Sequence, residues 1–140
     1  MLEFTFICGE NGYDVSRDLR EGIFGVQASD DKEGVSYHIV GYDKTRQIAV
    51  GRFFEEAKTV CRIDFVGVSK EYRRRYVGDL VIKAIEDKAK SLGIKTAVLE
   101  TPFAALPFFE FEGYENLGKT EDKVKMKKDL TKEHKCRGCV

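Results

Sequence analysis

The sequence has no excess of positive or negative charge, because 24 lysines and arginines balance 24 aspartates and glutamates. Without a net charge there is no overall field to draw the chain to nucleic acid or to an anionic membrane surface, so any anion site must be a local cluster of donors. The sequence also lacks any apolar run near the ~20 residues that a helix needs to cross a bilayer. We therefore expect no nucleic-acid partner and no membrane partner.

A secretory pattern is absent as well. Residues 1–7 alternate between apolar and other side chains and include Glu3, with none of the basic residues that open a signal peptide. They are typical of a strand of the folded protein. We expect a cytoplasmic protein.

Cysteine is scarce, and its four positions do not form a secreted disulfide framework. Cys8 and Cys61 lie in apolar, strand-like surroundings, where a reduced thiol packs as a small hydrophobic side chain. Cys136 and Cys139 form a Cys-x-x-Cys pair, which could be a redox pair or half of a zinc site. Structural zinc needs four ligands and no second Cys or His pair is evident, so we expect no metal site.

The rest of the composition, with 42% hydrophobic and 34% charged residues, is that of one soluble globular domain. No repeat and no linker interrupts the chain before about residue 130. We expect one domain at residues 1–130, followed by a tail at residues 131–140 that carries the Cys-x-x-Cys pair.

Hydrophobic periodicity predicts the order of the first elements. A turn at residues 9–12 follows the first strand, and a helix at 13–24 comes next, with an apolar stripe of Val15, Leu19 and Ile23. Alternating and apolar runs then predict three consecutive antiparallel strands, at residues 35–42, 47–55 and 59–68.

From residue 77 the apolar side chains recur at helical spacing as far as Leu92, and Gly93 is placed to end that helix. Residues 95–101 form a strand, which predicts a β-α-β unit with parallel strands. A short helix at 104–111, a strand opening near Tyr114 and an edge strand at 124–130 complete the chain. The expected fold class is α/β, in the α+β sense: a mixed, mainly antiparallel sheet with a central parallel β-α-β unit and helices on both faces.

The most informative segment lies between the buried strand and the long helix. Three consecutive arginines, Arg73, Arg74 and Arg75, come just before the helix, and Gly78 lies in its first turn. A helix N-terminus offers unpaired N–H groups and a partial positive charge, to which phosphate is suited, and arginine adds forked donors. The segment predicts a phosphate site; a solvated basic turn is the alternative.

This segment resembles the acetyl-CoA motif of the GNAT superfamily, Arg/Gln-x-x-Gly-x-Gly/Ala after a strand, with Arg73 in the first position and Gly78 in the last. Residues 20–24 resemble the Arg-x-x-Val-Phe segment of small bacterial members, and residues 38–40 resemble their second strand. Residues 108–114 resemble the later Phe-Tyr-x-x-x-Gly-Phe motif. The resemblance covers about residues 19–130, in the family's order.

The resemblance implies a GNAT fold and an acyl-CoA-dependent N-acyltransferase, which moves an acetyl group from acetyl-CoA, as cosubstrate, to an amine by direct attack. The acceptor would be a small-molecule or protein amine, and residues 124–130 could pair across a homodimer. A non-catalytic CoA-binding or acyl-CoA-binding module of the same fold is the alternative. The cofactor-binding residues that the resemblance implies are Val66, Val68, Arg73, Arg74, Arg75, Tyr76, Val77, Gly78, Asp79 and Phe109.

Two positions depart from the family pattern. Tyr76 replaces the first glycine of the motif, which is unfavourable if the backbone there must be left-handed and tolerable if it is helical. Phe109 stands where many family members have a tyrosine that protonates the departing thiolate, so here water would have to take that role.

Transfer to an amine also needs a base, and Asp64 is the candidate. It lies in an apolar strand, on the face expected for Val66 and Val68, and burial there would raise its pKa. Arg62 would share that face, so a structural ion pair between Arg62 and Asp64 is the alternative.

Overall fold

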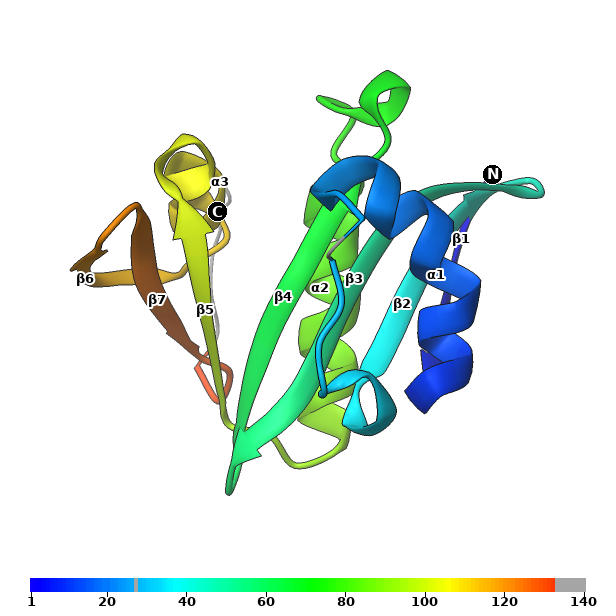
Figure 1. The fold of residues 1–140 in the computed structure, drawn as a ribbon. Coiled ribbons are helices and arrows are strands. Elements are labelled where there is room, and N and C mark those ends of the chain that lie inside the picture. The colour runs from blue at the N-terminus through cyan, green and yellow to red at the C-terminus, as the bar shows by residue number, and fades with distance from the viewer. Residues whose placement is uncertain (27, 133–140) are drawn as a thin grey trace. The chain divides into compact units, whose positions relative to one another are not determined.

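The structure, a computed structural model, describes residues 1–26 and 28–132. Its main elements follow one another along the chain as β1 (Leu2–Cys8), α1 (Gly9–Phe24), β2 (Tyr37–Asp43), β3 (Arg46–Ala57), β4 (Val60–Val68), α2 (Val77–Ser91), β5 (Thr96–Pro102), α3 (Leu106–Phe111), β6 (Glu115–Thr120) and β7 (Lys123–Asp129) (Figure 1). The strands form one seven-stranded sheet in the order β1-β2-β3-β4-β5-β7-β6. The expected mixed sheet is confirmed, as is its parallel β4–β5 pair.

The chain divides into two compact units. Unit 1 consists of Met1–Phe54 and Ile63–Asp87, and unit 2 consists of Glu55–Arg62 and Lys88–Val140. Among the described residues, no helix is both long enough and apolar enough to span a membrane.

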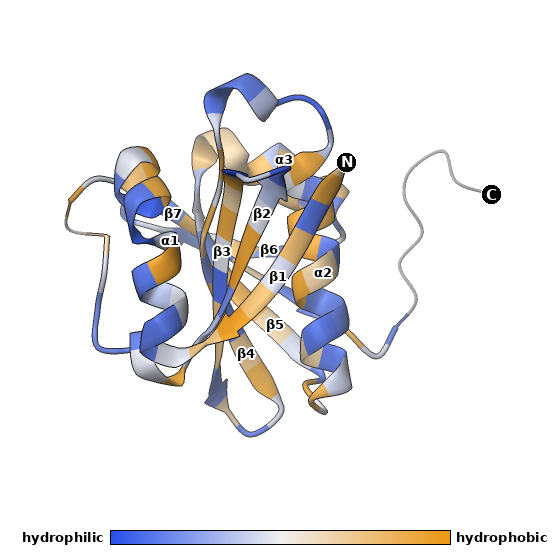
Figure 2. Cartoon of the chain, turned by 90° about the vertical axis from the view of Figure 1, so that its right-hand side faces the viewer, coloured by the Kyte–Doolittle hydropathy of each residue, from blue (hydrophilic) through white to orange (hydrophobic). Residues whose placement is uncertain are grey.

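In unit 1, β1 pairs antiparallel with β2 and β2 pairs antiparallel with β3, while α1 and α2 lie on opposite faces of these strands (Figure 2). The α2 face is apolar and tightly packed: a Cβ on Gly51 would lie within 3.2 Å of the side chains of Ile39, Val81 and Ile85. These three side chains are almost fully buried. Ile39 belongs to β2 and Val81 and Ile85 to α2, so α2 stabilises unit 1 by burying apolar side chains against the sheet.

The other face of the same strands is polar where α1 covers it. The side chains that α1 buries there are Gly12, Ser16 and Arg20, whereas Val15 of the expected apolar stripe is 40% exposed. The helix also begins at Gly9, so the expected turn at residues 9–12 is wrong. Gly12 explains the close packing, because a Cβ there would lie 2.3 Å from the carbonyl oxygen of Ile7.

One residue changes the alternation of β4. Phe65 has a positive φ of 49°, and its ring lies against Phe24 and beside Arg20, both on α1. A Cβ on Gly67 would also meet α1, at Ile23 and Phe24. Asp64, Phe65 and Gly67 therefore share one face. Since side chains alternate along a regular strand, Val66 and Val68 must lie on the opposite face, and the expectation that they share the face of Asp64 is wrong.

In unit 2, residues 60–62 of β4 pair in parallel with residues 96–98 of β5, and β7 pairs antiparallel with both β5 and β6. Strand β7 therefore lies inside the sheet and β6 forms its edge, so the expected edge strand at residues 124–130 is wrong. The alternation that suggested an edge has another cause: Val124 and Met126 are buried, while Lys125 and its neighbours on the other face are exposed.

The cysteines differ in their surroundings. Cys61 is fully buried, as its apolar strand predicts, whereas Cys8 is exposed at the end of β1. Cys136 and Cys139 lie outside the described residues.

Candidate functional site

The segment between β4 and α2 is fixed to the β2–β3 hairpin by several polar contacts. The Ser69 amide donates a hydrogen bond to the carbonyl of Ile48 on β3 at 2.7 Å. The Tyr72 hydroxyl donates to the Asp43 carboxylate at 2.5 Å, and this bond raises the pKa of Tyr72. Glu71 forms an ion pair with Arg46 at 3.2 Å. These contacts fix residues 69–72, a short 3₁₀ turn, relative to the hairpin.

Beyond this turn the backbone has two left-handed residues, Arg74 with φ 63° and Tyr76 with φ 62°. The Leu80 amide then donates to the Tyr76 carbonyl at 3.1 Å, which is the first hydrogen bond of α2. The amides of Val77 and Gly78 come before that bond and have no acceptor within the helix. Left-handed residues leading into a helix N-terminus turn successive amides toward one point, which suits an anion such as phosphate.

Tyr76 therefore occupies a position that favours glycine. A non-glycine residue in this conformation costs about 1–2 kcal/mol. The residue is 78% exposed.

The three arginines of this segment have different neighbours. Arg73 donates from Nε to the carbonyl oxygen of Val68 at 2.9 Å, so its guanidinium lies along the end of β4. The guanidinium of Arg75 lies 5.5 Å from the centroid of the Tyr72 ring. All three side chains are exposed. In the first turn of α2, Asp79 pairs with Lys83 at 3.1 Å, so a lysine compensates the acidic side chain of that turn.

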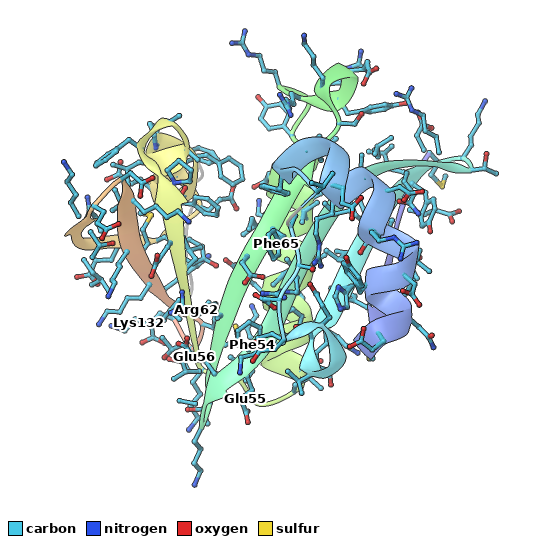
Figure 3. All side chains as sticks on the ribbon, in the orientation of Figure 1. Phe54, Glu55, Glu56, Arg62, Phe65 and Lys132 are labelled. Carbon is cyan, nitrogen blue, oxygen red and sulfur yellow. The ribbon has the colours of Figure 1, made fainter. Side chains whose placement is uncertain are left out.

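On the α1 face of β4, Asp64 binds Arg52 through both of its carboxylate oxygens. Arg52 Nε lies 2.6 Å from one oxygen and Nη2 lies 2.5 Å from the other. Figure 3 labels Phe65, the next residue along β4, at the place where the strand passes α1. Burial raises the pKa of Asp64, and the Arg52 guanidinium only partly opposes this.

The ion-pair partner of Asp64 is thus Arg52 of β3, and the alternative pairing with Arg62 is wrong. Arg62 lies in unit 2, where its Nε donates to Glu56 at 2.6 Å (Figure 3). Val66 does not share the face of Asp64, because the next side chain along β4 that points to the α1 side is that of Phe65. Asp64 as a catalytic base stays a prediction.

Behind Asp64 lies a buried polar cluster, which we call the Arg20–Arg52 cluster. Its members are Arg20, Asp30, Glu33, His38, Arg52 and Asp64. Arg20, Glu33, His38 and Arg52 are at least 96% buried in their side chains, whereas Asp30 is 44% exposed and Asp64 29% exposed. The cluster therefore presents two carboxylates at its surface and two guanidinium groups inside.

The hydrogen bonds of His38 determine its protonation. Because arginine has no acceptor, Arg20 Nη2 must donate to His38 Nδ1, 3.1 Å away. His38 Nε2 then carries the hydrogen and donates to the carbonyl of Glu33 at 3.2 Å. Burial lowers the pKa of His38, and the charge of Arg20 lowers it further. A neutral His38 thus joins α1 and β2 to the segment at residues 28–36.

The sequence indicated Asp64 as a candidate base but did not indicate the rest of the cluster. A signal that could have located it is Arg52, a charged residue in the middle of the run Ile48–Phe54, whose other members are apolar or glycine. A charge in a buried strand needs partners, and these come from segments far away along the chain. Arg20 and His38 drew attention only as part of a resemblance.

Phe109 lies in unit 2 and is 8% exposed. Its ring packs edge-on against Phe108, with centroids 5.0 Å apart, and against Tyr114, with centroids 5.7 Å apart. Phe109 is therefore a core residue of unit 2, and a contact with CoA stays a prediction.

Known proteins resemble this chain in sequence and in fold. The model of the acetyltransferase (GNAT) family matches residues 4–114. The uncharacterised N-acetyltransferase YjcF of Bacillus subtilis is 30% identical over 92 residues, which are 66% of this chain and 65% of that protein. Two crystal structures share the fold. A candidate N-acetyltransferase from Lactobacillus plantarum has a TM-score of 0.81 at 23% identity over 92% of this chain and 98% of its own.

The second is the PaiA N-acetyltransferase of Thermoplasma acidophilum in complex with coenzyme A, with a TM-score of 0.72 at 11% identity, over 92% of this chain and 99% of its own. The family model covers well over half of the sequence and includes β4, the arginine segment and α2. The chain belongs to the acetyltransferase (GNAT) family.

Proposed function

We propose that this protein transfers an acetyl group from acetyl-CoA to a primary amine of a small molecule or a protein, in a complex that holds both substrates. The observation that carries the proposal is the backbone between β4 and α2. Two left-handed residues there direct amides to the start of α2, beside three exposed arginines. A diphosphate matches this arrangement in charge and in the number of donors it accepts.

In this proposal the diphosphate of CoA binds the amides of Val77 and Gly78, and Arg74 and Arg75 reach its oxygens or the 3′-phosphate. The backbone of Val66 and Val68 holds the pantetheine as an added strand would. Arg73 already contacts the Val68 carbonyl, so it orders the strand end at which the phosphates begin.

The acceptor amine must lose a proton before its lone pair attacks the thioester carbonyl. Asp64 accepts that proton in the proposed mechanism, directly or through water. A carbon–nitrogen bond then forms, the carbon–sulfur bond breaks, and CoA leaves as a thiolate. The attacking nitrogen then loses its second proton, which passes through water to the thiolate, because Phe109 supplies no phenol.

Direct tests are binding and turnover. CoA is expected to raise the melting temperature of the wild type, and Gly78→Arg is expected to abolish this increase because the new side chain occupies the phosphate position. Gly22→Arg is the matched control, since Gly22 is an exposed helical glycine with open space around its Cα. If CoA stabilises Gly78→Arg as much as it stabilises the wild type, the assigned site is wrong.

Phe109 favours one second candidate, a CoA-binding module without catalysis, because the phenol that many relatives use is missing. Release of the CoA thiol from acetyl-CoA, measured with a panel of amines, separates the two functions. Acetylated product with any amine supports the transferase. Tight CoA binding without turnover on every amine supports the module.

A further inference from the structure

Every nitrogen of the Arg52 guanidinium contacts a carboxylate. Nε and Nη2 bind the two oxygens of Asp64, while Nη1 and Nη2 bind the two oxygens of Asp30 at 2.6 and 3.0 Å. Nη1 also lies 3.2 Å from Glu33 Oε1. One buried cation thus holds two carboxylates through bidentate contacts, one from β4 and one from the segment at residues 28–36.

Aromatic rings hold this guanidinium in place. Its central carbon lies 4.8 Å from the ring centroid of Phe65 and 5.3 Å from that of Phe54. The side chain of Arg52 is fully buried. A guanidinium packed in this way cannot swing toward one carboxylate without leaving the other, so the positions of Asp30 and Asp64 depend on each other.

The segment that carries Asp30 is anchored to α1 and β2 at its other contacts. Arg20 donates to the Ala28 carbonyl at 3.2 Å and binds Glu33 at 2.6 Å. His38 donates to the Glu33 carbonyl. The carboxylate of Asp30 is itself oriented by the Lys32 amide, 2.9 Å away. Asp30 is the most exposed member of the cluster, so its contact with Arg52 is the one that solvent or a bound acceptor can reach first.

The charges of the cluster do not cancel. Arg20 and Arg52 supply two positive charges, Asp30, Glu33 and Asp64 supply three negative charges, and His38 is neutral. Asp64 interacts electrostatically with Arg52 from β3, Asp30 from residues 28–36 and Arg20 from α1. Glu33 and His38 contact these two arginines. Removing one carboxylate therefore changes the field at the other.

We propose that Arg52 is a positioning residue that couples the segment at residues 28–36 to Asp64, so that the Asp64 carboxylate keeps its orientation only while Asp30 is bound to the same guanidinium. The acyl acceptor then binds beside a carboxylate whose orientation is already fixed. This inference rests on the proposed function only for the role of Asp64 in proton transfer. The coupling itself is a property of the protein without substrates.

The test compares Asp30→Asn with Asp31→Asn. Asp31 is the next residue on the same exposed segment, and no ion pair or side-chain hydrogen bond is described for it among residues 1–26 and 28–132. The pKa of the Asp64 carboxyl group is measured by carbon-13 NMR titration. The pKa of Asp64 is expected to fall in Asp30→Asn. The negative charge of Asp30, which raises this pKa, is removed, and Asp64 no longer shares Arg52 with it. It is expected to stay unchanged in Asp31→Asn.

A second measurement follows the segment. Hydrogen exchange of the amides at residues 28–36 is expected to be about tenfold faster in Asp30→Asn, since the loss of a charged hydrogen bond makes local opening of the segment easier. In Arg52→Lys the charge remains but the forked geometry does not. Adding Asp30→Asn to that variant is then expected to move the Asp64 titration less than in the wild type, by the lost Asp30 charge alone.

The outcomes separate this inference from the proposed function. A shifted Asp64 titration in Asp30→Asn with no turnover of acetyl-CoA by the wild type supports the coupling and contradicts the transferase. An unmoved titration together with unchanged exchange overturns the coupling, even if acetyl-CoA is consumed. If the wild type is active, Asp30→Asn is also expected to move the acid limb of its kcat/KM profile to lower pH. A purely structural contact would lower stability without that shift.

Discussion

The Tyr72 hydroxyl lies 2.5 Å from the Asp43 carboxylate, so the turn after β4 is bound to the end of β2. The ring of Tyr72 also lies beside two guanidinium groups, those of Arg46 and Arg75, at 5.6 and 5.5 Å. Through this one side chain, the hairpin supports the segment to which we assign the phosphates of CoA.

Tyr72→Phe keeps the ring and removes the hydroxyl. We expect CoA to bind severalfold more weakly, because residues 73–76 would have to be ordered on binding rather than beforehand. Isothermal titration with CoA measures the effect. Asp43→Asn should weaken binding in the same direction, and the double variant should add little to either change. Full additivity of the two changes would contradict the assigned contact.

Tyr76→Gly tests the left-handed position. Glycine adopts this conformation without a steric cost, so we expect the free energy of unfolding to rise by up to about 1 kcal/mol and CoA to bind more tightly. Tyr76→Ala removes the same ring but keeps the Cβ, so it should bring little of either gain. Chemical denaturation and CoA titration of the two variants give the comparison, and equal behaviour of glycine and alanine would mean that the ring and not the backbone matters.

Asp64→Asn removes the proposed base. In the wild type, kcat/KM should rise as pH rises through the pKa of Asp64, which burial holds above its ordinary value. The variant should be much slower and should lose that rise. A pH–rate profile of both proteins is the measurement, with Glu56→Gln as a control carboxylate. An unaltered profile would remove Asp64 from the mechanism.

The lowered pKa of His38 predicts that the folded protein loses stability in acid. Its pKa in the folded state lies below the ordinary value of 6.5, so below about pH 6.5 the unfolded chain binds a proton that the folded chain does not. The free energy of unfolding should therefore decrease as pH falls through this range. His38→Gln, which can still accept and donate, should show a smaller decrease between pH 7.5 and 5.5 in urea titrations, and identical slopes would contradict this.

The pattern of the sequence was sufficient for much of the fold. Period-2 and period-3.6 runs located the hairpin, the long helix α2 and the parallel strands β4 and β5, because each of these buries an apolar face. The start of α2 could be located as well, since three arginines and Gly78 follow directly after an apolar strand.

Hydrophobic periodicity did not predict the packing face where the buried side chains are polar. The α1 stripe was assigned to Val15, Leu19 and Ile23, but the buried residues of the helix are Gly12, Ser16 and Arg20, and Arg20 binds His38 and Glu33. Of the assigned stripe, Ile23 does lie against Gly67 of β4. The arginine partner of Asp64 was also missed. Nothing local in the sequence shows that Phe65 turns the strand, and the partner of Asp64 depends on that turn.

The positive φ of Phe65 has a consequence for engineering β4. The alternation of side chains along β4 shifts by one residue at Phe65. If β4 were exchanged for a regular strand of equal hydrophobicity, the side chains of residues 66–68 would therefore point to the opposite faces of the sheet. A valine or isoleucine at position 65 would favour such straightening, because β-branched side chains are rarely left-handed. Grafts between relatives must therefore carry residue 65 together with the strand on either side of it.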